Sequence, residues 1–336
     1  MNIFQRLPVK LFFILLFFLF SSLYAQDYEM GRGLTLSEKL HLGGYLSADY
    51  EAGDDKKQFR LDDVAVLAYG KLLPELSYMV EFEATPMYQK NYTTGAEQYN
   101  PRFYYERAYA DYAYSEMFNF RAGKQISPIG YWNLEPINVL RDTSSDPMYS
   151  YEMFPKFLTG ADIYGYLDES ATLKYHLFGQ KNENLDKETL NINAEQFFGL
   201  ALEYESSSQL NYGGSFGNFI TVDNKRTNFV QVDGKYDLYP LVFQFEAAYN
   251  DTDDNLQDNK TYKNSGYLQG IYHFNIRHAV IGRYEYFHDS ADSRTNNIGI
   301  IGYSYRPIYP VSIKGEAQYN SDERLNKIIF SFSVLF

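Results

Sequence analysis

The sequence predicts an all-β protein, a transmembrane antiparallel β-barrel of about 16 strands. Three observations predict this fold. An N-terminal export signal takes the chain out of the cytoplasm, no later segment is apolar enough for a spanning helix, and short segments of alternating polarity recur along the rest of the chain. Because backbone groups in lipid need hydrogen-bond partners within the protein, only helices and closed barrels cross a membrane.

The export signal occupies the first 25 residues. Arg6 and Lys10 precede an unbroken apolar run, Leu11–Phe20, and small residues end at Ala25. This is the pattern of a secretory signal cleaved before Gln26. The alternative is a retained membrane anchor, but a spanning helix needs about 20 apolar residues and the run is half that length. We therefore expect a cleaved signal peptide (1–25), a short periplasmic segment that is a tail or a plug (26–37), and the transmembrane barrel (38–336).

Composition supports a barrel and excludes several functions. The chain has 34 Tyr and 26 Phe, and Tyr suits the membrane–water interface because its ring is apolar while its hydroxyl stays wet. It has no Cys, which excludes disulfides and thiol chemistry, and no metal or cofactor motif. Of 30 Lys and Arg, two lie in the signal, so 28 remain against 43 Asp and Glu, a formal net charge of −15. That balance argues against nucleic acid as a partner.

Alternation with a period of two defines the strands. In the last segment, Phe330, Phe332 and Val334 fall on one face, and Ser331 and Ser333 fall on the other. A helix would need apolar residues three and four apart, and these segments lack them. Sixteen such segments are expected at 40–51, 57–71, 76–86, 103–114, 118–127, 160–168, 171–180, 195–205, 209–218, 227–237, 240–250, 263–274, 277–287, 295–306, 310–320 and 325–336.

The gaps between these segments alternate between tight turns and mostly longer polar loops. Short periplasmic turns opposite longer extracellular loops are typical of outer-membrane barrels. The gap between Ile126 and Gly160 is the third long loop, and its four prolines exclude a central strand. Its Trp, Met, Phe and Leu content is too apolar for disorder. We expect the loop to fold into the lumen, with a lid on the outer rim as the alternative.

Charged residues at mid-strand positions are expected to face the lumen, because the lipid face would cost a few kcal/mol for each. Four opposite-sign pairs lie two residues apart on one face and would either create a transverse electric field or simply brace the wall. They are Arg60/Asp62, Asp233/Lys235, Arg283/Glu285 and Lys314/Glu316. The expected inward residues are Asp49, Arg60, Asp62, Glu81, Glu83, Arg107, Asp111, Arg121, Lys174, Asp233, Lys235, Glu246, Arg283, Glu285, Lys314 and Glu316.

The third loop is expected to form a pore constriction. Its charged residues include four acids and two bases, and charges at a narrow point set ion preference. Together with the net charge, this favours a weak cation preference or none; alternatively, some carboxylates lie on the outer surface, bridged by divalent ions to lipopolysaccharide. The residues expected at the constriction are Trp132, Glu135, Arg141, Asp142, Asp146, Glu152 and Lys156.

The layout, with the aromatic Phe336 ending an amphipathic last strand, resembles Gram-negative outer-membrane porins. The terminal aromatic resembles the signal that barrel-assembly machinery reads. The segments Arg121–Gly130 and Lys156–Gly160 resemble the strand into the third loop, and the close of that loop, in the phosphate-selective porin O and P family. The resemblance implies an outer-membrane channel for small hydrophilic solutes, and it also implies a homotrimer. This chain departs from the family in having few lumenal Arg and Lys, which puts phosphate selectivity in doubt.

The sequence leaves three alternative functions. An anion- or phosphate-selective porin is the main alternative to a general diffusion channel. An outer-membrane barrel lipase or protease needs His near a nucleophile at the rim, and His288-Asp289-Ser290 is the only candidate. Adjacent strand residues point apart, so the tripeptide is not itself a triad, and no enzymatic activity is expected. A surface adhesin should have larger loops, and a barrel of about 16 strands leaves an aqueous lumen.

Overall fold

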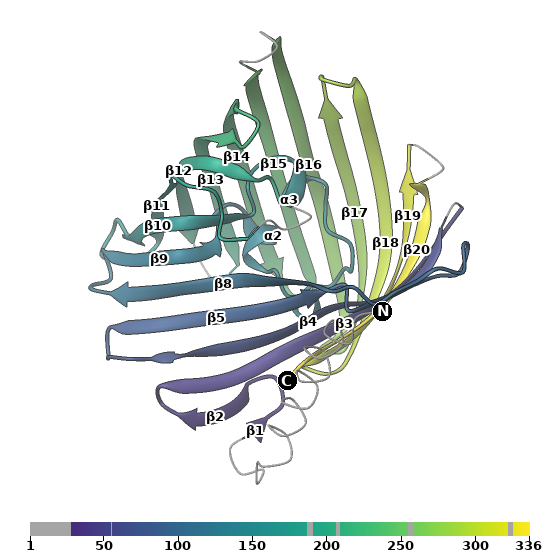
Figure 1. The fold of residues 1–336 in the computed structure, drawn as a ribbon, viewed down its shortest axis with the longest axis horizontal. Coiled ribbons are helices and arrows are strands. Elements are labelled where there is room, and N and C mark those ends of the chain that lie inside the picture. Colours follow the sequence, from purple (N-terminus) through teal and green to yellow (C-terminus); the bar gives the residue numbers. More distant parts are fainter. Residues whose placement is uncertain (1–27, 55, 187–190, 206–208, 255–258, 322–324) are drawn as a thin grey trace, which may run out of the picture.

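The computed structural model describes residues 28–54, 56–186, 191–205, 209–254, 259–321 and 325–336 (Figure 1). The expected signal peptide, residues 1–25, lies outside the described residues. In the described part of the chain, no helix combines the length and apolar character needed to cross a membrane.

Sixteen long strands in these ranges form one closed antiparallel barrel. Each strand pairs with its neighbours in sequence, and β20 pairs with β3 from Leu335↔Tyr45 to Lys327↔Gly53, which closes the ring. Each of the sixteen expected segments overlaps one of these strands. Their bounds are β3 (Leu40–Gly53), β4 (Lys57–Lys71), β5 (Leu76–Thr85), β8 (Arg102–Ala113), β9 (Asn119–Ile126), β10 (Phe157–Tyr166), β11 (Leu173–Gln180), β12 (Ala194–Glu205), β13 (Leu210–Thr221), β14 (Lys225–Leu238), β15 (Leu241–Asp254), β16 (Asn259–Asn275), β17 (His278–Asp289), β18 (Arg294–Ile308), β19 (Val311–Asn320) and β20 (Lys327–Leu335).

Four short strands extend the barrel wall at its margins. β1 (Tyr28–Glu29) pairs with β2 (Gly33–Ser37), and β2 pairs with the start of β3. The sheet therefore begins before residue 38, where the barrel was expected to start. β6 (Tyr88–Asn91) pairs with β4 and with β7 (Glu97–Gln98), so the second loop also contains a hairpin.

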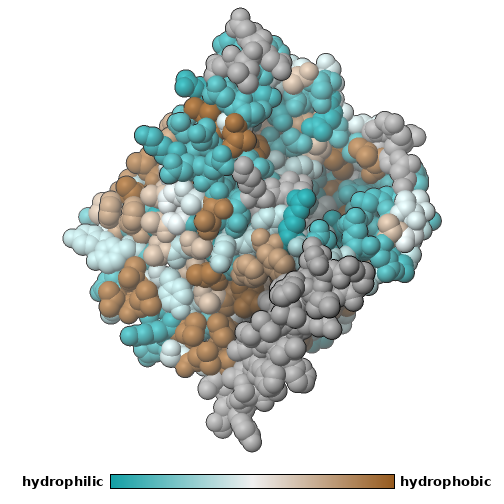
Figure 2. All heavy atoms as spheres, viewed as in Figure 1, coloured by the Kyte–Doolittle hydropathy of each residue, from teal (hydrophilic) through white to brown (hydrophobic). Residues whose placement is uncertain are grey.

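Several strands run further from the short-turn end than the sequence predicted. β15 and β16 pair as far as Asp254↔Asn259, so most of the loop expected over residues 251–262 is strand. Similarly, β13 and β14 continue to Thr221 and Lys225. The sequence prediction ended each strand where the apolar residues that face lipid end. The backbone hydrogen bonds between strands continue beyond that point, because they do not need apolar side chains. Figure 2 shows hydrophilic side chains gathered at the upper tip, where β15 and β16 end in Figure 1.

The two faces of the wall differ in polarity, as a barrel requires. On β15, Phe243 and Phe245 are 46% and 44% exposed on the outer face, while Gln244 and Glu246 are 9% and 1% exposed on the inner face. The same pattern holds on β14, β17 and β19. The lumen is therefore polar, and the buried apolar cluster lies where the third loop packs against the wall.

Residues 127–156 form the third loop, which contains α2 (Tyr131–Leu134), the 3-10 helix η2 (Asn138–Leu140) and α3 (Tyr149–Glu152). Figure 1 shows α2 and α3 between the strands β8 to β10 and the strands β15 to β17. The loop leaves β9 and returns to β10, which are adjacent strands paired from Ile126↔Phe157 to Asn119↔Tyr164. Both of its ends are thus fixed at one place on the wall.

Candidate functional site: the lumen and its third loop

Three glutamates on the wall opposite β9 and β10 bind the backbone of the third loop. The Trp132 N–H donates to Glu246 of β15 at 2.8 Å, and the Met148 N–H donates to Glu285 of β17 at 3.0 Å. Glu316 of β19 accepts from the N–H groups of Ser144 and Ser145 at 3.0 and 3.1 Å. The loop therefore crosses the interior and is fixed at both walls.

Three basic residues bind carbonyl oxygens of the same loop. Arg283 donates to the Ser145 carbonyl at 2.9 Å, and Lys314 donates to the carbonyl of Thr143 at 3.1 Å. Arg306 donates to the carbonyls of Leu140 and Arg141 at 2.9 and 2.7 Å. Hydrogen bonds to charged groups contribute about 1.5–3 kcal/mol each, roughly twice the neutral value, so these anchors hold the loop firmly.

Apolar packing completes the attachment. Met153 and Phe154 of the loop are fully buried, and Phe154 lies 6.3 Å, ring to ring, from Phe229 of β14. The single Trp of the chain, Trp132, has the guanidinium groups of Arg141 and Arg283 4.9 and 5.0 Å from its ring. The loop thus brings its own core to a polar lumen, which explains its apolar sequence.

Ion pairing within the loop fixes its charged side chains. Arg141 forms an ion pair with Asp146, and the Trp132 indole N–H donates to the same carboxylate at 3.3 Å. Burial by itself favours the neutral acid, but the charges of Arg141 and Lys156 outweigh it, so the pKa of Asp146 lies below its ordinary value. Asp146 is therefore ionised at neutral pH.

The wall that faces the free side of the loop is acidic. A cavity of about 1030 Å³ separates the loop from β3, β4, β5, β8 and the outer ends of β18 to β20. Among the described residues that line it, ten are Asp or Glu and six are Lys or Arg, and four of these sixteen (Arg141, Asp146, Glu152 and Lys156) belong to the loop itself. The acids are Asp49, Glu51, Asp54, Asp62, Asp63, Glu83, Glu106, Asp146, Glu152 and Glu285, and the bases are Lys56, Arg60, Arg141, Lys156, Arg294 and Lys327.

All the wall residues expected to be inward lie on the polar face, but their pairing differs from the expectation. Arg60 is 3.4 Å from Asp62, and Arg283 is 2.8 Å from Glu285, as the spacing suggested. The other two expected pairs are not formed. Asp233 instead accepts from Gln231 at 2.6 Å and Lys235 has no ion pair within the described residues, while Lys314 and Glu316 bind the third loop. The two-residue spacing correctly predicted that these side chains share one face of the strand. It could not predict that Lys314 and Glu316 hydrogen-bond to the third loop instead of to each other.

Other pairs join neighbouring strands. Arg107 bonds with Glu81, Arg121 lies 2.6 Å from Asp111, and Lys174 lies 3.9 Å from Glu203. These links brace the wall across the ladder.

The loop residues expected at a constriction divide between the two sides of the loop. Asp146, Glu152, Lys156 and Arg141 line the large cavity, and Glu152 is 3.1 Å from both Lys263 and Arg294. Trp132, Glu135 and Asp142 line a second, smaller cavity on the other side, together with Arg141. Asp142 lies 3.5 Å from Arg306.

Sequence reasoning missed several lumenal charges. Glu106 and Asp63 were overlooked because the register shifts beside them, between Glu81 and Phe82 and between Leu46 and Ala48. A bulge puts two consecutive residues on one face, which breaks the period of two. Arg306 and Lys263 were overlooked because they lie near strand ends. The unused signal was the presence of adjacent charges, Glu106-Arg107 and Asp62-Asp63, within otherwise alternating strands.

His288, Asp289 and Ser290, the enzymatic candidates, do not form a catalytic triad with one another. His288 Nδ1 is 2.9 Å from Thr295 Oγ1, and Ser290 Oγ accepts the Tyr262 N–H at 2.8 Å. In the part of the chain that the structure describes, no group of three His, Cys, Asp or Glu could hold a metal ion.

A closed antiparallel barrel whose third loop crosses the interior defines the class of 16-strand porin folds. Solved structures of other outer-membrane barrels have a similar fold. The chain aligns with a loop-deletion mutant of OmpT, an outer membrane protein of Vibrio cholerae, with a TM-score of 0.64 at 11% identity over 89% of this chain and 99% of that one. An anion-selective porin from Comamonas acidovorans aligns with a TM-score of 0.64 at 9% identity over 89% of this chain and 99% of that one. OmpF of Salmonella typhi aligns with a TM-score of 0.59 at 14% identity over 88% of this chain and 97% of that one.

No protein-family model matches the chain, and no curated protein matches it in sequence. The chain has the fold of a 16-strand porin barrel.

Proposed function

We propose that this protein is an outer-membrane porin, a passive diffusion channel for small hydrophilic solutes and ions with a cation-leaning selectivity. The observation that carries the proposal is the cavity beside the third loop, where Asp and Glu outnumber Lys and Arg by ten to six among the described lining residues. A charged constriction sets ion preference, and an excess of fixed negative charge raises the local concentration of cations. The fold comparisons support a channel rather than an enzyme, since the aligned proteins are named as porins or outer membrane proteins.

The third loop forms the constriction in this proposal. Its support is the set of backbone hydrogen bonds to Glu246, Glu285 and Glu316, which hold the loop across the interior. Fixed in this way, the loop leaves solutes the space between it and the acidic wall. The expected setting is the Gram-negative outer membrane, with lipid and lipopolysaccharide around the barrel, and with barrel-assembly machinery reading Phe336. A homotrimer is also expected, and OmpT of Vibrio cholerae has been described in a trimer form.

Anion or phosphate selectivity is the second candidate, because one aligned structure is an anion-selective porin and because Arg121–Gly130 resembles the porin O and P family. The side chains of that segment argue against it. Arg121 is paired with Asp111, and Lys124 is 1% exposed with its ammonium 5.1 Å from the Phe157 ring. Neither is free to bind a phosphate in the lumen.

The test is the reversal potential of the purified, folded protein in a planar lipid bilayer under a salt gradient. Stable open steps with a modest cation preference are the expected result. Strong anion preference, with block by added phosphate, would replace this proposal by the second candidate. Absence of conductance from protein that shows the heat-sensitive gel mobility of a folded barrel would remove the channel proposal altogether.

A further inference from the structure

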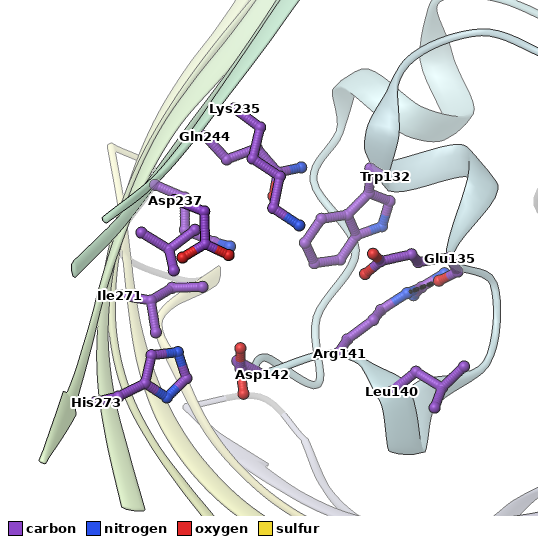
Figure 3. A pocket seen from close by; sticks show the side chains of 12 residues that line it. Trp132, Glu135, Leu140, Arg141, Asp142, Lys235, Asp237, Gln244, Ile271 and His273 are labelled. Carbon is purple, nitrogen blue, oxygen red and sulfur yellow. Dashed lines mark hydrogen bonds between the residues drawn. The ribbon is translucent and has the colours of Figure 1, made fainter. Parts of the chain in front are cut away.

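The smaller cavity beneath the third loop differs from the rest of the lumen. It has a volume of about 160 Å³ and lies between the loop and the inner face of β14, β15 and β16 (Figure 3). Trp132, Glu135 and Arg141 face it from the loop, and Lys235 and Asp237 face it from β14. Because β14 ends one residue after Asp237, at a two-residue turn, the cavity lies toward the short-turn end of the barrel.

Three charged groups of this cavity have no protein partner among the described residues: Lys235, which is half-buried, and Asp237 and Glu135, which are exposed to the lumen. The other two are paired, Arg141 with Asp146 and Asp142 with Arg306. Gln269 also lines the cavity, is 3% exposed, and has a side-chain oxygen without a hydrogen-bond partner. A buried polar group without a partner costs about 1–3 kcal/mol, so a group of this kind facing a cavity indicates a ligand that supplies the missing bonds.

The arrangement of charge selects the ligand. Lys235 and Asp237 lie two residues apart on the same face of β14, which places their strand positions about 7 Å apart. They remain separate instead of closing on each other. A cation and an anion at this spacing match a solute that carries a carboxylate and an ammonium group on neighbouring atoms. The second free carboxylate, Glu135, faces the same space from the loop, on the opposite side (Figure 3).

We propose that this cavity is a binding site for small zwitterionic solutes of the α-amino acid type, with the solute carboxylate on Lys235 and its ammonium group between Asp237 and Glu135. The Gln269 amide oxygen accepts a further hydrogen bond from the solute. The inference rests on the proposed function, since it makes the cavity a solute subsite of the channel. The Trp132 ring does not serve as a stacking platform, because Arg141 and Arg283 already lie against it.

The test compares three solutes of nearly equal size. L-alanine is the zwitterion, L-alaninamide carries only the ammonium group, and L-lactate carries only the carboxylate. Each is titrated from the short-turn side of single channels in a bilayer while the potassium chloride conductance is recorded. We expect saturable reduction of conductance by alanine, and at least ten-fold weaker effects of the other two. Equal effects of all three solutes, or no saturable effect of alanine on an open channel, would overturn the proposal.

Two variants locate the site. Lys235→Gln and Asp237→Asn should each weaken the effect of alanine at least ten-fold, whereas Lys71→Gln, a matched change at the exposed end of β4, should leave it unaltered. An unchanged response in both cavity variants would place binding elsewhere and refute the proposal. Saturation-transfer NMR of alanine with the folded protein in detergent micelles detects binding without a current. Alanine contact that is absent in Lys235→Gln would support the site even if no channel opens, so failure of the channel proposal and failure of this one are distinguishable.

Discussion

The backbone N–H of Trp132 donates to the carboxylate of Glu246 at 2.8 Å, across the barrel from the strands that carry the third loop. Glu246 also accepts the hydroxyl of Tyr267, so one buried acid joins the loop to two strands. The equivalent acids on β17 and β19 repeat the arrangement on every second strand. Residues that a strand pattern assigns to the lining of a pore therefore serve to hold the element that narrows it.

Glu246→Ala should loosen the loop. The change leaves the Trp132 N–H and the Tyr267 hydroxyl without an acceptor, and each buried donor left unpaired costs about 1–3 kcal/mol. We expect a lower unfolding temperature and a larger, noisier single-channel conductance. Glu169→Ala, an exposed change in a short turn, is the control. Unaltered conductance in a folded Glu246→Ala barrel would show that the loop does not depend on this anchor.

Neutralising acids of the large cavity should reduce cation preference. Glu51 and Asp62 both line the cavity from the wall, and Asp62 is 3.4 Å from Arg60. The double variant Glu51→Gln/Asp62→Asn removes two acidic side chains from this lining, so the reversal potential should move toward the anion side. Glu116→Gln, exposed in a short turn, should leave it unchanged. A shift toward greater cation preference would mean that the ions take another path.

The ion pair of Asp146 with Arg141 predicts a pH dependence. Because the pKa of Asp146 in the folded protein is below its ordinary value, its ionised form stabilises the fold at every pH above about 4. That contribution is lost as pH falls through the lowered pKa, when the carboxyl becomes protonated. Asp146→Asn should therefore unfold at a lower temperature than the parent at pH 7, and the difference should shrink at pH 3. An equal difference at both pH values would exclude the charge as its cause.

The strands could be predicted from sequence because lipid and lumen impose opposite polarity on alternate residues. All sixteen segments were located in this way, and the largest errors occur where the environment stops alternating. Residues 251–254 and 259–262 are strands in the structure although both faces are polar there. Such residues meet water on each side, so hydropathy carries no information about their pairing.

The site was less predictable, because contacts between the loop and the far wall are set by three-dimensional folding. The sequence indicates that Glu246, Glu285 and Glu316 face the lumen. It does not indicate whether each carboxylate binds water, a basic side chain or a backbone N–H. Glu106 was missed for a different reason, the register shift at Glu81. A β-bulge adds one residue to a strand and so changes the face on which the next side chains lie, and amino-acid composition does not reveal it.

The outer face should reject charge at the barrel's mid-height. Val232 is 51% exposed at the middle of β14, with its Cα partner Ala247 and the exposed Phe245 and Tyr249 on either side of that partner on the adjacent strand. Lys at the bilayer midplane of such a face costs about 2–4 kcal/mol. Val232→Lys should lower the unfolding free energy in lipid vesicles by that amount, whereas Val222→Lys, in an outer turn, should change it by less than about 1 kcal/mol. Equal effects would mean that Val232 does not face lipid.

Phe336 should matter more for assembly in cells than for stability of the finished barrel. Its backbone N–H donates to the Gly44 carbonyl at 2.8 Å, and its carbonyl accepts the Gly44 N–H at 2.7 Å, so the last residue closes the seam between β20 and β3 through its backbone. Phe336→Ala keeps both bonds and removes only the ring. If the ring is the feature read by assembly machinery, the variant should refold in detergent nearly as well as the parent but reach the outer membrane in much smaller amounts. Leu335→Ala, which also keeps the seam bonds, is the control for lost apolar surface. Equal loss of refolding in detergent and of membrane insertion in cells would instead assign the ring to packing against Gly44, where its carbons lie 2.6 and 2.8 Å from the position of an added Cβ.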